Sequence, residues 1–100
     1  MTEPPFEVEI QREFGLSHND FFRIFPRIEP DSRQIAERCV EIDRADGRRL
    51  QIEISLEKVR QLASFKIPFM DITFRFSDWS DEQRAEFFEK FDRAFQKGGG

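Results

Sequence analysis

The sequence predicts an α+β domain in which helices pack on one face of a four-stranded antiparallel sheet. Four segments alternate apolar and polar residues with a period of two, and three others repeat apolar residues with a helical period. Such alternation is typical of strands that bury one face and expose the other. The expected order, β-α-β-β-α-β-α, matches a ferredoxin-like βαββαβ arrangement followed by a C-terminal helix. An alternative, βαβββα, omits the middle helix and makes the last three strands a meander.

The first strand is expected over residues 6–14, and the first helix follows it directly. Ser17 is a typical N-cap residue, and Asp20 three positions later makes an acidic variant of the capping box. Because proline disrupts a helix interior, Pro26 should kink or end this helix near Phe25.

The middle of the chain contains two strands and a weaker helical signal. Strands are expected over residues 35–43 and 48–56, joined by a turn at residues 45–47. An Asp-Gly pair suits such a turn because it tolerates positive φ. Residues 57–65 hold two apolar side chains three positions apart, which predicts a short helix.

The fourth strand is expected over residues 69–77, and the last helix begins after Ser80. Gln83 completes a capping box with that serine. The helix then carries an apolar stripe whose members are Phe87, Phe88, Phe91, Ala94 and Phe95. The chain has thirteen Phe and no Tyr, and side chains without a hydroxyl group favour a dry, Phe-rich core.

Length and charge limit the possible classes of protein. One hundred residues make a single domain over residues 1–100, with frayed tails at 1–5 and 98–100. A net charge of −4 argues against binding to nucleic acid or to an anionic membrane. The single cysteine, Cys39, has no partner for an internal disulfide, and the polar, proline-rich start does not look like a signal peptide. We therefore expect a soluble cytoplasmic protein.

The beginning of the first helix is the candidate ligand-binding site. Helix N-termini offer unpaired N–H groups and partial positive charge to an anion. Ser17, His18 and Asn19 would supply these groups, and Arg12 would add a counter-charge. Capping alone also explains the residues, and no nucleophile and base occur together, so no catalytic residue is predicted. One His and one Cys cannot form the usual zinc site, and no metal or cofactor is expected.

The surplus of aromatic residues suggests a partner surface. Phe69 and Trp79 lie out of phase with the buried strand positions or at strand ends, and the last helix must cover Phe87 and its neighbours. These residues are either core or contacts for a protein partner, which includes a second copy in a homodimer. We therefore expect a protein-binding or accessory domain without catalytic activity. The alternative is a domain that binds a small anion or nucleotide at residues 17–20.

Overall fold

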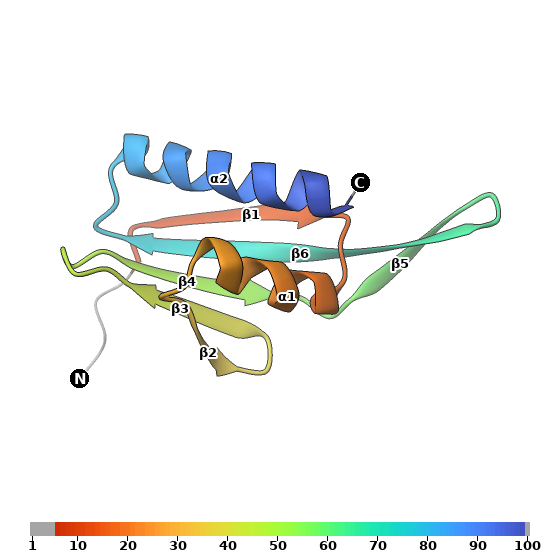
Figure 1. The fold of residues 1–100 in the computed structure, drawn as a ribbon, viewed down its shortest axis with the longest axis horizontal. Helices are drawn as coiled ribbons and strands as arrows, with labels where there is room; N and C mark the ends of the chain where they lie inside the picture. Colours follow the sequence, from red (N-terminus) through yellow and green to blue (C-terminus); the bar gives the residue numbers. More distant parts are fainter. Residues whose placement is uncertain (1–5, 100) are drawn as a thin grey trace.

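The computed structural model describes residues 6–99, with side chains described as far as Phe95. It is an α+β structure in which two helices lie on the same side of a six-stranded antiparallel sheet (Figure 1). The helices are α1 (His18–Ile28) and α2 (Asp81–Gly99). The strands are β1 (Val8–Phe14), β2 (Arg33–Ala36), β3 (Cys39–Asp43), β4 (Arg49–Ile54), β5 (Lys58–Leu62) and β6 (Phe65–Ser77).

The long strand β6 belongs to two parts of the molecule. Its C-terminal part, from Met70 onward, pairs with β1 on one side and β4 on the other, within the sheet order β1-β6-β4-β3-β2. Its first residues pair only with β5, which lies off this path. Residues 58–69 therefore form a two-stranded hairpin, the β5–β6 arm, which extends away from the rest of the sheet (Figure 1).

The prediction of a four-stranded, ferredoxin-like sheet is wrong, and so is the strand count of the βαβββα alternative. The predicted strand over residues 35–43 is two strands, because a turn at residues 37 and 38 separates β2 from β3. The predicted helix over residues 57–65 is absent. Instead, residues 58–62 form β5 and a tight turn follows. The period-two pattern of Phe65, Ile67 and Phe69 belongs to the first part of β6.

Alternation along the strands does place the core as predicted. The even-numbered side chains of β3, of β4 and of β6 from Met70 onward are all buried beneath the helices, and they are Val40, Ile42, Leu50, Ile52, Ile54, Met70, Ile72, Phe74 and Phe76. Leu56 would continue this series but is 65% exposed, because β4 ends at Ile54.

A cluster of phenylalanine rings fills the space between the sheet and the helices. Phe74 on β6 contacts Phe88 and Phe91 of α2, with ring centroids 4.9 and 5.3 Å apart. The two helices meet where Phe21 stacks on Phe95 at 5.9 Å. Edge-to-face and offset contacts of this kind stabilise a core beyond the burial of apolar area. The helices are thus fixed on the sheet by aromatic packing.

Both helices begin where the sequence predicts. The Asp20 N–H donates to Ser17 Oγ at 3.1 Å, which caps α1. At α2 the capping box is reciprocal, since the Gln83 N–H donates to Ser80 Oγ at 3.1 Å and Gln83 Oε1 accepts from the Ser80 N–H at 2.9 Å. These bonds satisfy N–H groups that lack partners within the first helical turn.

Of the two predicted effects of Pro26, a kink or an end of the helix near Phe25, the end is wrong. Pro26 lies inside the helix, which continues to Ile28. Proline removes only its own N–H bond, and the Glu29 N–H still donates to the Phe25 carbonyl at 2.9 Å. The residues after Pro26 carry Glu29, the C-cap of α1, to a position where it is 2% exposed.

At the chain ends, residues 1–5 and Gly100, which were expected to fray, lie outside the described residues. Gly98 and Gly99 are helical and belong to α2. Neither described helix is both long enough and apolar enough to cross a lipid bilayer.

Candidate functional site

The predicted anion site at the start of α1 already contains a carboxylate of the chain itself. The His18 N–H donates to Glu57 Oε1 at 2.9 Å, and His18 Nε2 lies 2.8 Å from the Ser55 carbonyl oxygen. Because Ser17 Oγ accepts from the Asp20 N–H, two N–H groups in the first turn of α1 are capped by groups within the protein. Asn19 is exposed beside them.

Arg12, predicted as the counter-charge of that site, has other partners. Its guanidinium lies 4.0 Å from the centre of the Phe88 ring and 3.3 Å from Asp92 Oδ2 on α2. It therefore ties β1 to the last helix. Of the four residues predicted to bind a ligand, three are neighbours at the start of α1, and Arg12 serves a different contact.

The three residues predicted as a partner surface lie in two different environments. Trp79 and Phe87 are 7% and 4% exposed, and the Trp79 indole N–H donates to the Arg49 carbonyl at 2.9 Å. Phe69 is half-buried at the base of the β5–β6 arm, where the Arg60 guanidinium lies 4.4 Å from its ring centre. Only Phe69 thus belongs to an accessible part of the surface.

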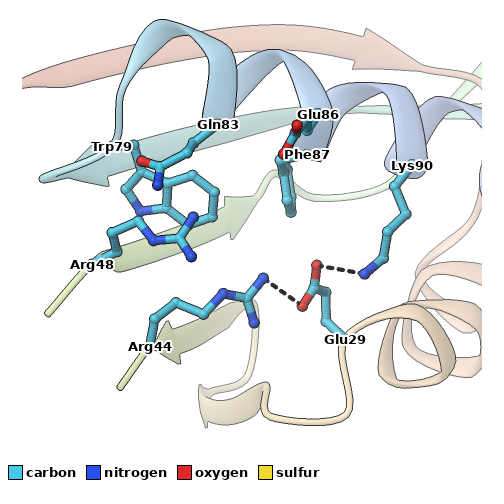
Figure 2. A pocket seen from close by; sticks show the side chains of 8 residues that line it. All are labelled: Glu29, Arg44, Arg48, Trp79, Gln83, Glu86, Phe87 and Lys90. Atoms are coloured by element: carbon cyan, nitrogen blue, oxygen red, sulfur yellow. Dashed lines mark ion pairs between the residues drawn. The ribbon is translucent and has the colours of Figure 1, made fainter. Parts of the chain in front are cut away.

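A pocket of about 280 Å³ opens between the first turns of α2 and the β3–β4 turn (Figure 2). Glu29 lies at its base and is 2% exposed. Glu29 Oε1 lies 2.9 Å from Arg44 Nη2, and Glu29 Oε2 lies 3.4 Å from Lys90 Nζ. The pocket is lined by Glu29, Arg44, Arg48, Trp79, Gln83, Glu86, Phe87 and Lys90.

Arg48 forms the opposite wall of this pocket. Its guanidinium lies 4.7 Å from the centre of the Trp79 ring, and its Nε lies 2.9 Å from Asp46 Oδ2. The hydrogen bond from the Arg48 backbone N–H is the largest cause that lowers the pKa of Asp46 below its usual value. The lining combines three cations with two carboxylates around an indole and offers no nucleophile, and each cation is paired with a carboxylate of the chain.

Nothing in the sequence identifies this pocket in advance. Glu29, Arg44 and Lys90 come from the end of α1, the β3–β4 turn and α2, and they are far apart along the chain. The pocket exists because α1 continues past Pro26 to Ile28 and places Glu29 next to Lys90 of α2.

The β5–β6 arm has a different surface. Among the described residues, five of the six large hydrophobic side chains that are strongly exposed lie on the arm or in the segment leading into it. They are Leu56, Val59, Leu62, Phe65 and Ile67, with exposures of 65, 62, 53, 69 and 39%. The sixth is Ile35, on β2.

Strand register shows which face of the arm is apolar. Leu62 lies opposite Phe65, and residues opposite one another in an antiparallel pair share a face. Phe65, Ile67 and Phe69 alternate with the even-numbered side chains of β6 that point at the helices, so they lie on the helix-free face. The four residues that form this apolar row are Leu62, Phe65, Ile67 and Phe69.

Two ion pairs lie on the same face of the arm as the apolar row, because Lys58 is opposite Phe69 and Arg60 is opposite Ile67. Lys58 Nζ lies 3.0 Å from Asp71 Oδ2 on β6, and Arg60 Nη2 lies 2.7 Å from Glu13 Oε2 on β1. Each pair joins an arm residue to the body of the sheet. The charge beside the row is therefore balanced within the chain.

The rest of the helix-free face is covered by charged side chains. Arg75, at its centre, lies 3.3 Å from Glu9 Oε1 and 2.9 Å from Glu53 Oε1. Cys39 lies on the same face, and burial, followed by the charges of Glu53 and Glu41, raises its thiol pKa above the usual 9.0. Within the described part of the chain, no group of three or more His, Cys, Asp or Glu side chains could hold a metal ion.

Comparison with known proteins adds no function to this geometry. No protein-family model matches the chain, and neither a curated protein nor a solved structure gives a significant match.

Proposed function

We propose that this chain is a protein-binding domain and that the β5–β6 arm is its contact surface. The observation that supports this most directly is the concentration of exposed hydrophobic side chains on the arm. The rest of the helix-free face, by contrast, carries charged side chains. Exposed apolar patches with polar borders are characteristic of interaction sites.

The arm also lacks what normally stabilises a hairpin. A two-stranded hairpin alone in water is marginally stable, and three or more strands or a packed layer are needed. Every residue of β5 is exposed, and so are the first three residues of β6. A partner that covers the apolar row would add the missing layer. Full burial of one Leu, Ile or Phe side chain contributes roughly 1.5–3 kcal/mol.

This proposal involves binding without catalysis. The one thiol, Cys39, has a raised pKa, and a thiol that is held protonated is a poor nucleophile. Because this chain has a single cysteine and no internal disulfide, we place its action in a reducing compartment such as the cytoplasm.

Co-purification tests the proposal. The tagged chain is expressed in the cells that produce it naturally, beside a variant that carries Phe65→Ser and Ile67→Ser, and the associated proteins are compared. We expect the native chain to retain specific proteins, including untagged copies of itself if it self-associates, that the variant loses. Ile35→Ser is the matched control, because Ile35 is a similarly exposed residue outside the arm. Identical associated proteins for all three chains would refute the proposal.

A second candidate function is the binding of a small anion, and the pocket of Figure 2 is a better location for it than the start of α1. Arg44, Arg48 and Lys90 line an open space beside the indole of Trp79, whereas the start of α1 offers no such space in the described structure and Glu57 accepts from its first N–H. An anion in the pocket would compete with Glu29 and Asp46 for these cations. Guanidinium groups suit the planar oxygens of carboxylates and phosphates.

The single tryptophan makes this second function easy to test. Trp79 fluorescence is followed during titration with inorganic phosphate and, separately, with acetate, up to millimolar concentrations. Saturable quenching that Arg48→Gln weakens would support the pocket. An unchanged signal with both anions would remove this candidate and leave the first unaffected.

A further inference from the structure

We propose that the partner protein adds an extended segment, as a third strand, along the outer edge of β5. This inference rests on the proposed function, and it names the kind of segment that the arm binds. Among the described elements β5 lies beside β6 alone, so its other edge has no neighbouring strand. A segment that adds to such an edge is held by main-chain hydrogen bonds, and its alternate side chains give specificity.

The hydrogen bonds of β6 show which way its backbone groups point. On the β1 side of β6, the Phe76 carbonyl accepts from the Glu7 N–H at 3.0 Å. On the β4 side, the Asp71 carbonyl accepts from the Ser55 N–H at 2.9 Å. Because these groups alternate between the two sides along a strand, the odd-numbered residues of β6 direct their N–H and C=O groups toward β4 and, further along, toward β5.

The same alternation leaves two residues of β5 with outward-facing backbone groups. The odd-numbered residues of β6 in the arm lie opposite Lys58, Arg60 and Leu62, which therefore bond to β6. Val59 and Gln61 lie between them, so their N–H and C=O groups point away from β6. All five residues of β5 are exposed, so a partner strand has access to this edge.

The opposite edge of the arm is less suited to a strand. Pro68 is an even-numbered residue of β6, so its backbone faces that edge, and proline has no N–H to donate. The Pro68 carbonyl oxygen lies 3.9 Å from the position that a Cβ atom on Gly15 would take, so the chain after β1 lies against this edge. Within the described arm, Lys66 alone keeps an N–H there, whereas the β5 edge has two, at Val59 and Gln61.

The other outer strands of the described sheet carry features that discourage strand addition. β1 places a charged residue, Arg12, on the face that packs against α2, where it pairs with Asp92. β2 is four residues long, and its register with β3 shifts between Gln34 and Ala36. Inward-pointing charges, short strands and bulges all protect an edge.

The two cations of β5 do not cover its outer edge. Lysine and arginine on an edge strand can block an incoming strand. Here Arg60 reaches across β6 to Glu13 on β1 at 2.7 Å, and Lys58 bonds to Asp71 on β6 at 3.0 Å, so both side chains lean away from that edge. A third strand would supply what a two-stranded hairpin lacks, and its side chain beside Leu62 would extend the apolar row. We therefore expect a segment that alternates apolar and polar residues.

Proline substitutions at the two edges test the added strand. Gln61 and Lys66 lie opposite each other, and both direct their N–H groups away from the hairpin. Gln61→Pro therefore removes a donor from the β5 edge, and Lys66→Pro, the matched control, removes one from the opposite edge. The probes are short overlapping peptides that cover the sequence of a protein that the native chain retains and the variant with Phe65→Ser and Ile67→Ser loses. We expect one peptide to bind Lys66→Pro as it binds the native chain, and to bind Gln61→Pro about tenfold more weakly, the effect of one or two lost hydrogen bonds.

Amide exchange of the native chain, alone and with the bound peptide, remains decisive if a proline disturbs the hairpin. The N–H groups of Val59 and Gln61 should gain more protection than that of Lys66, because only the former face the added strand. Equal gains at the two edges would mean that the partner covers a face of the arm, and would overturn the inference.

The remaining outcomes separate this inference from the proposed function. If the arm variant loses proteins but no peptide binds, or the peptide binds Gln61→Pro as tightly as the native chain, the arm contacts a folded surface. The proposed function then stands and the added strand is refuted. If the only protein retained is a second copy of this chain, the partner named here is wrong. If every variant retains the same proteins, both proposals fail.

Discussion

Glu29 and Arg44 form a buried ion pair, with 2.9 Å between Glu29 Oε1 and Arg44 Nη2. Glu29 follows α1, and Arg44 follows β3, so the pair joins two elements across the edge of the sheet. Lys90 on α2 completes the contact at 3.4 Å from Glu29 Oε2. Three elements are thus held by one carboxylate that is 2% exposed.

Removing this carboxylate should weaken the fold. Breaking a buried pair by removing one partner is costly because the other charge stays behind. Arg44 is only partly buried and Lys90 is half-exposed, so we expect Glu29→Gln to lower the free energy of unfolding by about 2–3 kcal/mol in urea titrations. Asp31→Asn is the control, because Asp31 is 71% exposed and 3.8 Å from the same arginine. Equal effects of the two substitutions would contradict this interpretation of the pair.

The same substitution at two positions of β6 should separate core from contact surface. Phe74 is fully buried among the rings of α2, and Phe65 is 69% exposed on the arm. In dilute protein we expect Phe74→Ala to cost about 3–5 kcal/mol and Phe65→Ala to change stability by less than about 0.5 kcal/mol. Thermal and urea unfolding measure both. A large loss for Phe65→Ala in the dilute monomer would mean that the arm packs within its own chain.

The tip of the arm contains backbone strain that glycine should relieve. Ala63 has φ of 55°, a left-handed conformation that costs residues with a Cβ roughly 1–2 kcal/mol. Because glycine is also freer in the unfolded chain, we expect Ala63→Gly to increase local stability by only about 0.5–1 kcal/mol. Slower amide exchange of residues 58–69 would show this. Ser64→Gly, at a position without positive φ, should have no stabilising effect.

The Cys39 thiol should react slowly at mildly alkaline pH. Burial, and then the charges of Glu53 and Glu41, raise its pKa above 9.0, so the folded chain disfavours the thiolate. The stability that this group contributes is complete below its unfolded pKa and is lost as pH rises through the higher folded pKa. Alkylation by iodoacetamide at pH 8 should therefore be slower in the native chain than in urea. Equal rates, corrected for the denaturant with a model peptide, would argue against the raised pKa.

Much of the body of the fold could be predicted from local patterns. Period-two alternation correctly placed Ile52 and Phe74 in the core, and the caps at Ser17 and Ser80 begin their helices as expected. The arm was missed because Val59 and Leu62 are three positions apart, which is a helical spacing, whereas in the observed strand they lie on opposite faces and every residue of β5 is exposed. Only the pairing of this segment with β6, which forms in the tertiary structure, makes it a strand and not a helix.

The candidate sites were harder to predict because they depend on contacts between distant elements. Helix propensity alone ended α1 at Pro26, and with α1 ended there, Glu29 could not be placed beneath α2. Likewise, the sequence predicts free N–H groups at the start of α1. The His18 N–H instead donates to Glu57, which is distant in sequence and is brought there by the tertiary structure.

Amide hydrogen exchange tests most directly whether the β5–β6 arm is a contact surface, when the purified chain alone is compared with the chain bound to the proteins that co-purify with it. Exchange reports local opening residue by residue, and the arm can be compared with β4 in the same sample. We predict that the amides of residues 58–69 exchange quickly in the chain alone and become protected in the complex, while those of Arg49–Ile54 are protected in both. Arm amides that exchange equally fast with and without the bound proteins would contradict the account.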